Sequence, residues 1–141
     1  MLNLDKEKYK PDNFLTEEEA IKLVEQLKKQ GKKVGLCTGS WDLLHPGHIT
    51  HFESAKKFCD VLIVGVARNE YSSSKYPESR RPIYSDDIRA FMVSKLKPVD
   101  YVVFENGEPE FILKIKPDVY IKGSDYANLK NPNEVDAPPL G

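Results

Sequence analysis

The stretch Val61-Leu62-Ile63-Val64-Gly65-Val66 is apolar throughout and is the clearest strand signal in the sequence. A strand without alternation of polar and apolar residues is typical of a parallel sheet that is covered on both faces. A second apolar run at 34–38 precedes it, and between the two runs apolar residues recur at helical spacing from about Pro46 onward. Strand, helix and strand in this order predict a right-handed crossover between two parallel strands.

The same alternation continues on both sides of this unit. Upstream, Thr16 and Glu19 form a capping-box pattern, and Gly31 marks the end of the helix that follows. Downstream, the sequence predicts helices at 86–96 and 111–115 and strands at 101–104 and 118–122. Segments without periodicity, predicted to be irregular, are 1–15, 68–85 and 131–141. The order predicts an α/β fold, a Rossmann-like open parallel sheet with helices on both faces.

Each predicted helix carries an apolar stripe that is expected to face the sheet. The predicted stripes are Ala20, Leu23, Val24 and Leu27 in the first helix, Ile49, Phe52, Ala55 and Cys59 in the second, and Ile88, Phe91, Met92 and Leu96 in the third.

Length and composition bound the class of protein. The 141 residues are expected to form one domain, 1–141. Lysine plus arginine (21) nearly balance aspartate plus glutamate (22), so neither nucleic acid nor an anionic membrane is an expected partner. No segment approaches the roughly 20 apolar residues of a membrane span, and the charged N-terminus is unlike a signal peptide. Cys37 and Cys59 are interpreted as free thiols, and the expected location is cytoplasmic.

The chemistry is concentrated in Thr38-Gly39-Ser40-Trp41-Asp42-Leu43-Leu44-His45-Pro46-Gly47-His48, which leaves the first long strand and enters the next helix. Ligands bind at this end of the strands in open parallel sheets, and a helix N-terminus presents unpaired N–H groups to a phosphate. Gly39 is expected to let the backbone approach a ligand, and Gly47 leaves room for a phosphate between His45 and His48. Two imidazoles placed there are able to donate hydrogen bonds to phosphate oxygens.

A blander interpretation exists for two histidines three residues apart, which are often surface residues or a chance metal pair. Here the pair follows an apolar strand, a glycine and an aspartate at a helix start, and this context favours a phosphate site. Three neighbours are interpreted more plainly. Trp41 is expected to pack in the core, Asp42 to cap a helix or orient the loop without binding metal, and His51 to lie on the helix surface.

The run from Gly39 to His48 resembles the signature of the cytidylyltransferase-like nucleotidyltransferases. The wider segment from Lys33 to Tyr126 resembles the nucleotidyltransferase domain of the heptose-phosphate adenylyltransferases, which make ADP-heptose. The motifs that carry this second resemblance are Arg81-Pro82 followed by Arg89, Lys-Pro-Asp at 116–118, and Lys-Gly-Ser-Asp-Tyr at 122–126, close to that subgroup's Lys-Gly-Gly-Asp-Tyr. Glycerol-3-phosphate cytidylyltransferase and archaeal FAD synthetase share the first signature and the fold.

The resemblance implies roles for individual residues. The implied catalytic residues are His45, His48, Lys75 and Arg89, with the histidines on the NTP phosphates and Arg89 near the reacting phosphates or the acceptor. The implied nucleotide-binding residues are Thr38, Gly39, Ser40, Trp41, Gly47, Gly123 and Asp125. The expected cofactor is Mg²⁺, which bridges NTP phosphates and offsets their charge.

Three of these residues have an ordinary alternative. Lys75 lies in a serine-rich loop, where a lysine is commonly solvated, and Arg89 lies on the polar side of a helical stripe, where an arginine is commonly exposed. Asp125 follows Gly123 closely enough for plain turn chemistry.

Two departures from the family pattern concern the loop and the end of the chain. The loop normally carries two lysines three apart, but Lys75 is followed by Glu78, and the loop is about one residue shorter before Arg81. This bears on the contacts to the acceptor phosphate. The family's C-terminal serine/threonine-rich motif is absent before Gly141, so the domain is expected to lack the last strand and helix.

The function that follows is transfer of a nucleotidyl group from an NTP, with ATP the expected donor, to a phosphorylated sugar such as heptose 1-phosphate, with release of pyrophosphate. The rivals within the fold are glycerol 3-phosphate with CTP, or FMN with ATP. A module that binds nucleotide without chemistry is a rival from another class, and a fragment of a class I aminoacyl-tRNA synthetase is disfavoured by length and charge. Relatives of this fold often form dimers, so a homodimer is a further expectation.

Overall fold

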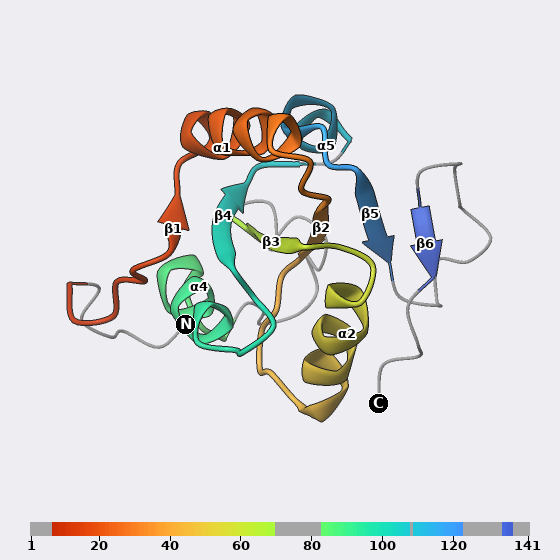
Figure 1. Cartoon of the computed structure of the whole chain (residues 1–141). Helices are drawn as coiled ribbons and strands as arrows, with labels where there is room; N and C mark the ends of the chain where they lie inside the picture. The colour runs from red at the N-terminus through yellow and green to blue at the C-terminus, as the bar shows by residue number, and fades with distance from the viewer. Residues whose placement is uncertain (1–6, 70–82, 108, 123–133, 137–141) are drawn as a thin grey trace.

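The structure is a computed structural model that describes residues 7–69, 83–107, 109–122 and 134–136. Within these residues six strands form one sheet in the order β1-β4-β3-β2-β5-β6, and each neighbouring pair is parallel. The strands are β1 (Phe14–Leu15), β2 (Val34–Gly39), β3 (Val61–Ala67), β4 (Tyr101–Glu105), β5 (Val119–Lys122) and β6 (Glu134–Asp136), and the helices are α1 (Glu17–Lys29), α2 (Pro46–Lys56), α4 (Asp86–Ser94) and α5 (Glu110–Ile115). The predicted α/β fold with a parallel sheet is confirmed (Figure 1).

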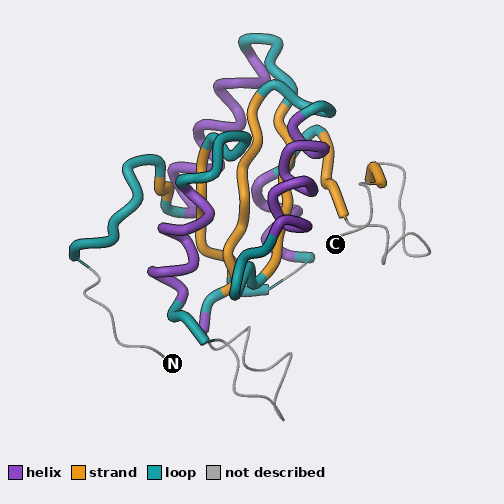
Figure 2. The backbone as a smooth tube through the Cα atoms, turned by 90° about the horizontal axis from the view of Figure 1, so that it is seen from below, coloured by secondary structure: helices purple, strands orange, loops and turns teal. Residues whose placement is uncertain are grey.

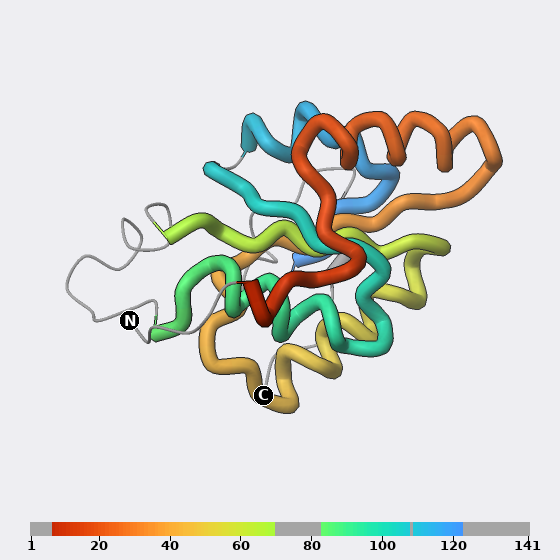
Figure 3. The backbone as a smooth tube through the Cα atoms, turned by 90° about the vertical axis from the view of Figure 1, so that its left-hand side faces the viewer, coloured from red at the N-terminus to blue at the C-terminus, as the bar shows by residue number. Residues whose placement is uncertain are grey.

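The helices cover both faces of the sheet. Helices α1 and α5 lie over one face, and α2 and α4 lie over the other (Figure 3). Figure 2 views the sheet from the α2 and α4 side, with these two helices running alongside the strands. Each face has its own apolar core. Phe52 of α2 and Val93 of α4 belong to one core, and Val24 of α1 and Ile115 of α5 belong to the other. The sheet is therefore buried on both sides, as the apolar strands require.

Local sequence explains where the elements begin and end. At the start of α1 the N–H of Glu19 donates to the Thr16 hydroxyl at 3.1 Å, and the N–H of Thr16 donates to the Glu19 carboxylate at 3.0 Å. This is the capping box that the sequence predicts. Gly31 adopts a φ of +77° just after the helix, a conformation that glycine adopts without strain. Strand β3 is buried from Leu62 to Ala67, in agreement with its unbroken apolar run.

Two predictions about irregular segments are wrong. Phe14 and Leu15 form a strand that pairs with Val102 and Val103 of β4. Residues 134–136 form a strand that pairs with β5. Both strands lie at the edges of the sheet and are only two or three residues long. Such short runs carry no periodicity of their own, and partners distant in the sequence hold them in place.

The faces of α2 and α4 also differ from the predicted stripes. Ile49 and Met92 are exposed, with relative accessibilities of 39% and 48%, whereas His51 and Arg89, which were expected at the surface, are 3% and 1% exposed. Each helix is rotated so that polar side chains near its N-terminus turn inward. Because these two helices begin beside the same edge of the sheet, that edge contains buried polar groups that hydrophobic periodicity does not predict.

The connections place a switch point next to β2. The chain passes from β2 to β3 and β4 on one side, and then returns to the other side of β2 as β5. In open parallel sheets the crevice at the carboxyl ends of the strands at such a point is where ligands bind. Strand β2 ends at Gly39 and leads into α2 through residues 40–45. The fold thus presents this loop at the expected binding edge.

Candidate functional site

The loop after β2 contains two residues in the left-handed region. Trp41 has a φ of +54° and Leu43 a φ of +52°. Non-glycine residues held there cost on the order of 1–3 kcal/mol each, and they persist only where the surrounding structure holds them. Trp41 is 8% exposed and Leu43 is 48% exposed, so the backbone alternates sharply between inward and outward side chains. This loop is therefore shaped by contacts outside itself.

The Trp41 side chain belongs to the core. Its indole N–H donates to the backbone carbonyl of Gly65 in β3 at 2.9 Å, and its ring lies 4.6 Å from that of Phe52, centroid to centroid. A Cβ atom on Gly39 would lie 2.9 Å from the indole ring. Gly39 was predicted to make room for a ligand, but in the structure the Trp41 ring fills the space that a side chain would take. Because the indole is packed in the core, the backbone of Trp41 is the part that could contact a nucleotide.

The two histidines form the N-terminal cap of α2. The N–H of Gly47 donates to Nδ1 of His45 at 3.0 Å, and the N–H of His45 donates to Nδ1 of His48 at 3.1 Å. Their ring centroids are 3.9 Å apart. The sequence predicted that His45 and His48 act together, and the structure brings them together. The spacing of three residues has a local cause, since it is the spacing of a capping box.

These hydrogen bonds determine the tautomers of both rings. A nitrogen that accepts a hydrogen bond carries no proton, so each neutral imidazole carries its proton on Nε2. Burial, together with His45 and His51, lowers the pKa of His48 to about 4. His48 is therefore neutral at physiological pH. Within the described residues neither Nε2 has a hydrogen-bond partner, so both remain available as donors at the helix start.

The first turn of α2 is receptive to anions. It contains no acidic residue, whereas the first turn of α1 contains Glu17, Glu18 and Glu19. The positive end of the α2 dipole is thus not offset by side chains of its own helix. Gly47 is buried between the two histidines and adds no side chain there. The arrangement of helix dipole and two Nε2 donors suits a phosphate.

Thr38 and Ser40 lie on the two sides of Gly39. The Thr38 hydroxyl is 2.5 Å from the Tyr120 hydroxyl of β5, across the switch point. The Ser40 carbonyl accepts a hydrogen bond from the Arg89 guanidinium at 2.6 Å. Both predicted residues are thus at the carboxyl edge of β2, and each is tied to another element.

Arg89 was predicted to lie near the phosphates or the acceptor, with an exposed helix arginine as the alternative. In the structure its side chain is buried. Its guanidinium also donates to the Tyr84 carbonyl at 2.9 Å and to Oδ1 of Asn69 at 3.1 Å. Burial lowers the pKa of Arg89, and the nearby carboxylates of Asp86 and Asp42 oppose that shift. The contact to Ser40 places Arg89 against the loop.

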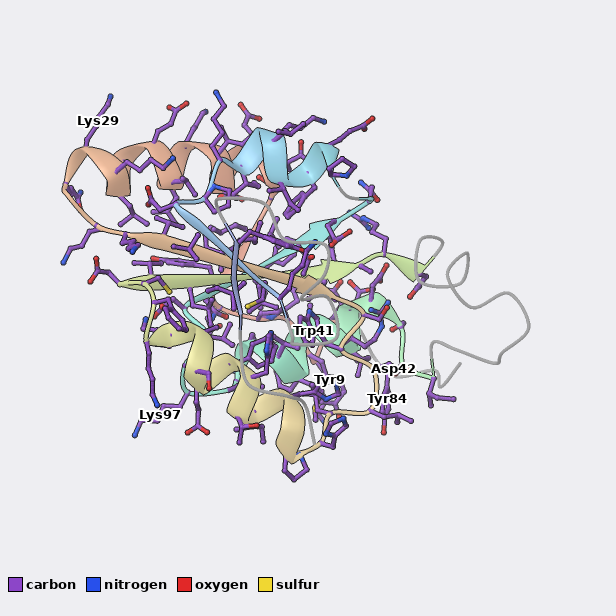
Figure 4. All side chains as sticks on the ribbon, turned by 90° about the vertical axis from the view of Figure 1, so that its right-hand side faces the viewer. Tyr9, Lys29, Trp41, Asp42, Tyr84 and Lys97 are labelled. Atoms are coloured by element: carbon purple, nitrogen blue, oxygen red, sulfur yellow. The ribbon has the colours of Figure 1, made fainter. Side chains whose placement is uncertain are left out.

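Sequence reasoning predicted that Asp42 caps a helix or orients the loop, but it missed Asn69 and Asp86 at this edge. Asp42 is 8% exposed, and its carboxylate accepts the N–H groups of Ile83 at 2.6 Å and Tyr84 at 3.1 Å, so it orients the loop (Figure 4). Asn69 and Asp86 exchange two backbone-to-side-chain hydrogen bonds, at 3.1 and 2.8 Å. The available signal was positional, because Asn69 lies two residues after β3 and Asp86 begins a helix.

Three predicted site residues, Lys75, Gly123 and Asp125, lie outside the described residues. Strand β5, which ends at Lys122, pairs with β2. Within the described ranges no group of three His, Cys, Asp or Glu side chains is placed to hold a metal ion. Both oxygens of Asp42 already accept backbone N–H groups. The described donor set does not fit a metal held by the protein alone.

No helix in the described part of the chain has the length and apolar character needed to cross a membrane.

Comparison with known proteins identifies the family of the chain. The family model described as cytidylyltransferase-like matches residues 36–136. The bifunctional protein HldE of Helicobacter pylori (strain G27) is 41% identical over 109 residues, which are 76% of this chain and 23% of that protein. HldE of Aliarcobacter butzleri (strain RM4018) is 43% identical over 113 residues, 79% of this chain and 24% of that protein. The chain thus spans about a quarter of the length of the curated relatives it matches.

A solved structure gives a second line of support. The lipopolysaccharide core biosynthesis protein from Thermoplasma volcanium GSS1 aligns with a TM-score of 0.63 and 28% identity, covering 79% of this chain and 98% of that one. The family match begins in β2 and includes the whole histidine loop. With its parallel sheet, its histidine-capped helix and these matches, the chain belongs to the cytidylyltransferase-like family of nucleotidyltransferases.

Proposed function

We propose that this domain transfers a nucleotidyl group from an NTP, with ATP the expected donor, to a phosphorylated sugar such as heptose 1-phosphate, and releases pyrophosphate. The observation that carries the proposal is the pair of Nδ1 acceptors in the α2 cap. Because the backbone N–H groups of Gly47 and His45 hold Nδ1 of His45 and His48, each Nε2–H is left to donate to a phosphate.

The proposed chemistry is a direct in-line displacement. A phosphate oxygen of the acceptor attacks the α-phosphorus of the NTP, a new P–O bond forms, and the bond to the β-phosphate bridging oxygen breaks. Negative charge grows on the phosphate oxygens and on the departing pyrophosphate. The Nε2–H donors of His45 and His48 and the N-terminus of α2 stabilise that charge from fixed positions. Holding both reactants in line supplies the rest of the rate.

No step requires a protein nucleophile. The thiol of Cys37 is fully buried in β2, and burial raises its pKa. Burial also raises the pKa of Cys59. A thiol that stays protonated is a poor nucleophile. Both cysteines are therefore assigned to packing, which agrees with direct transfer between the two substrates.

Magnesium is proposed to arrive with the NTP. Bound there, it would supply positive charge that offsets the charge of the phosphates. Because the Asp42 carboxylate is engaged by two backbone N–H groups, we do not assign it as a ligand. The protein's own part is to hold the phosphates through N–H donors, with no carboxylate cage among the described residues.

The sugar acceptor rests on resemblance. Lys-Gly-Ser-Asp-Tyr at 122–126 is close to the motif of the ADP-heptose subgroup, and the relatives include the bifunctional protein HldE. The lipopolysaccharide core biosynthesis protein of Thermoplasma volcanium is similar over most of this chain. These similarities favour a sugar phosphate over glycerol 3-phosphate or FMN.

The test is pyrophosphate release with Mg²⁺, using ATP or CTP against heptose 1-phosphate, glycerol 3-phosphate and FMN. We expect release with ATP and heptose 1-phosphate. Release only with CTP and glycerol 3-phosphate, or only with ATP and FMN, would move the enzyme to another branch of the family. Tight ATP binding with no release in any pairing would replace the enzyme with a nucleotide-binding module.

A further inference from the structure

The Arg89 guanidinium joins three segments that are far apart in the sequence. It is 1% exposed, and its donors reach the Ser40 carbonyl in the loop after β2, Oδ1 of Asn69 at the end of β3, and the Tyr84 carbonyl before α4. Ser40 and Arg89 are 49 residues apart. Each bond runs in a different direction, as the planar fork of a guanidinium allows and a single ammonium does not.

Asp42 makes a second tie between the same segments. Its carboxylate accepts the N–H groups of Ile83 and Tyr84, and Arg89 holds the carbonyl of that same Tyr84. The N–H of Tyr84 thus donates to a residue of the loop, and the carbonyl of Tyr84 accepts from the arginine. Figure 4 shows Asp42 and Tyr84 side by side. Two independent contacts therefore fix the loop after β2 against the segment before α4.

Asn69 and Asp86 complete the network. They exchange two backbone-to-side-chain hydrogen bonds, and the amide oxygen of Asn69 also accepts from Arg89. This oxygen therefore has two donors, the N–H of Asp86 and the guanidinium. The start of α4 and the end of β3 become one rigid support for the arginine.

The part of the loop that this network holds is the strained part. Ser40 precedes Trp41, Asp42 precedes Leu43, and both Trp41 and Leu43 have a positive φ. Such a backbone relaxes unless its neighbours hold it. The loop leads directly into the His45 cap, so its shape determines where the cap meets the phosphates.

We propose that Arg89 and Asp42 are positioning residues, which hold the backbone of residues 40–43 in the shape that receives the NTP phosphates, and that the Arg89 guanidinium itself does not bind phosphate. The role rests on the proposed function, since it concerns NTP binding. It differs from the role that the family resemblance implies for Arg89, which is contact with the reacting phosphates or the acceptor.

The test uses the single tryptophan of the chain, Trp41, as a reporter inside the loop. Arg89→Lys, Arg89→Met and Asp42→Asn are compared with Asp118→Asn. The control carboxylate also accepts a backbone N–H, that of Val34 at 2.8 Å, but at the opposite end of the sheet. Intrinsic fluorescence is recorded without substrate, and the ATP dissociation constant is then measured by titration.

Two results are expected from the arginine variants. Arg89→Lys keeps the charge but cannot reach three acceptors, so it should shift the Trp41 emission as Arg89→Met does and weaken ATP binding by a similar factor, about tenfold or more. If the guanidinium bound phosphate instead, the variants would weaken ATP binding and leave the Trp41 emission before substrate unchanged. Retention of ATP affinity in Arg89→Lys within twofold, with unchanged emission before substrate, would overturn the proposal.

Asp42→Asn is a second test, in which the two explanations predict opposite changes in ATP affinity. It preserves side-chain size and so remains usable if the arginine variants fail to fold. Removal of a negative charge near an anion site should by electrostatics alone tighten ATP binding. Loss of the double hydrogen bond should instead weaken it and shift the emission. Tighter or unchanged binding with unchanged emission would refute the role of Asp42. The emission measurements need no turnover, so they decide the matter even if the proposed reaction fails.

Discussion

Helices α1 and α2 begin with similar reciprocal caps built from different residues. In α1 the pair is Thr16 and Glu19, and in α2 it is His45 and His48. In each pair the second residue accepts the backbone N–H of the first through a side-chain atom that carries no proton. The donor from Thr16 lowers the pKa of Glu19, whereas burial is the main cause of the lowered pKa of His48.

The two caps differ in the hydrogen-bond donors that they leave available and in the charge beside the helix start. Threonine is a favoured N-cap residue, and the three glutamates of the first turn offset the α1 dipole. Histidine is not a favoured cap, and the first turn of α2 has no acid. In return each imidazole keeps an Nε2–H, which a carboxylate or hydroxyl cap lacks in that position. The α1 cap serves the stability of its helix, whereas the role proposed for the α2 cap is to receive an anion.

The largest expected effect comes from removing the imidazoles. His45→Ala or His48→Ala should lower kcat by on the order of 100-fold or more, by comparison with loss of one oxyanion donor. The matched change in the other helix, Thr16→Ala, should cost about 1 kcal/mol of stability and leave kcat unchanged. Steady-state kinetics and thermal unfolding of all three variants separate the two caps. A mild effect on kcat at both histidines would contradict their assignment.

A charge added to the first turn of α2 should affect stability and binding in opposite directions. Ile49 is 39% exposed in that turn, and Ile49→Glu supplies the acid that α1 has and α2 lacks. The helix should keep or gain stability through its dipole, while ATP binding weakens by roughly threefold to tenfold through repulsion of about 1 kcal/mol. Ile49→Gln is the neutral control. The difference should shrink as salt rises, and equal affinities at low salt would argue against an anion at this helix end.

The smallest effect concerns the titration of His48. Its pKa in the folded chain is about 4, against an ordinary value of 6.5, so the unfolded chain binds more protons between these values. Its contribution to stability is complete above about pH 6.5 and is lost as the pH falls through about 4. With three histidines in the sequence, NMR can follow each ring, and His48→Gln should flatten this part of the stability profile. A His48 ring that titrates near 6.5 would contradict the half-buried, neutral imidazole.

Much of the fold follows from local sequence. The apolar run of β3 requires burial on both faces, and Thr16 with Glu19 locates the start of α1. The edge strands escaped prediction because Phe14–Leu15 and Glu134–Asp136 are too short to show a period and depend on partners distant in the sequence.

The helix faces were predicted less well, and the errors fall near the site. Periodicity placed Arg89 and His51 outside because it treats charged and polar residues as solvent-facing. Arg89 is buried because acceptors from three other segments satisfy it, and His51 because it packs beside Trp41 and Phe52. No local pattern contains that information.

The sequence by itself determined the alternation of strands and helices, the parallel sheet, and the place of the two histidines at the start of a helix. These follow from patterns a few residues long, in which each side chain acts on its own backbone. Only the tertiary structure decided that Arg89 and His51 are buried, what fills the space beside Gly39, and what holds the strained loop. Those outcomes depend on hydrogen bonds and packing between segments up to 49 residues apart, which form only when the sheet brings them together.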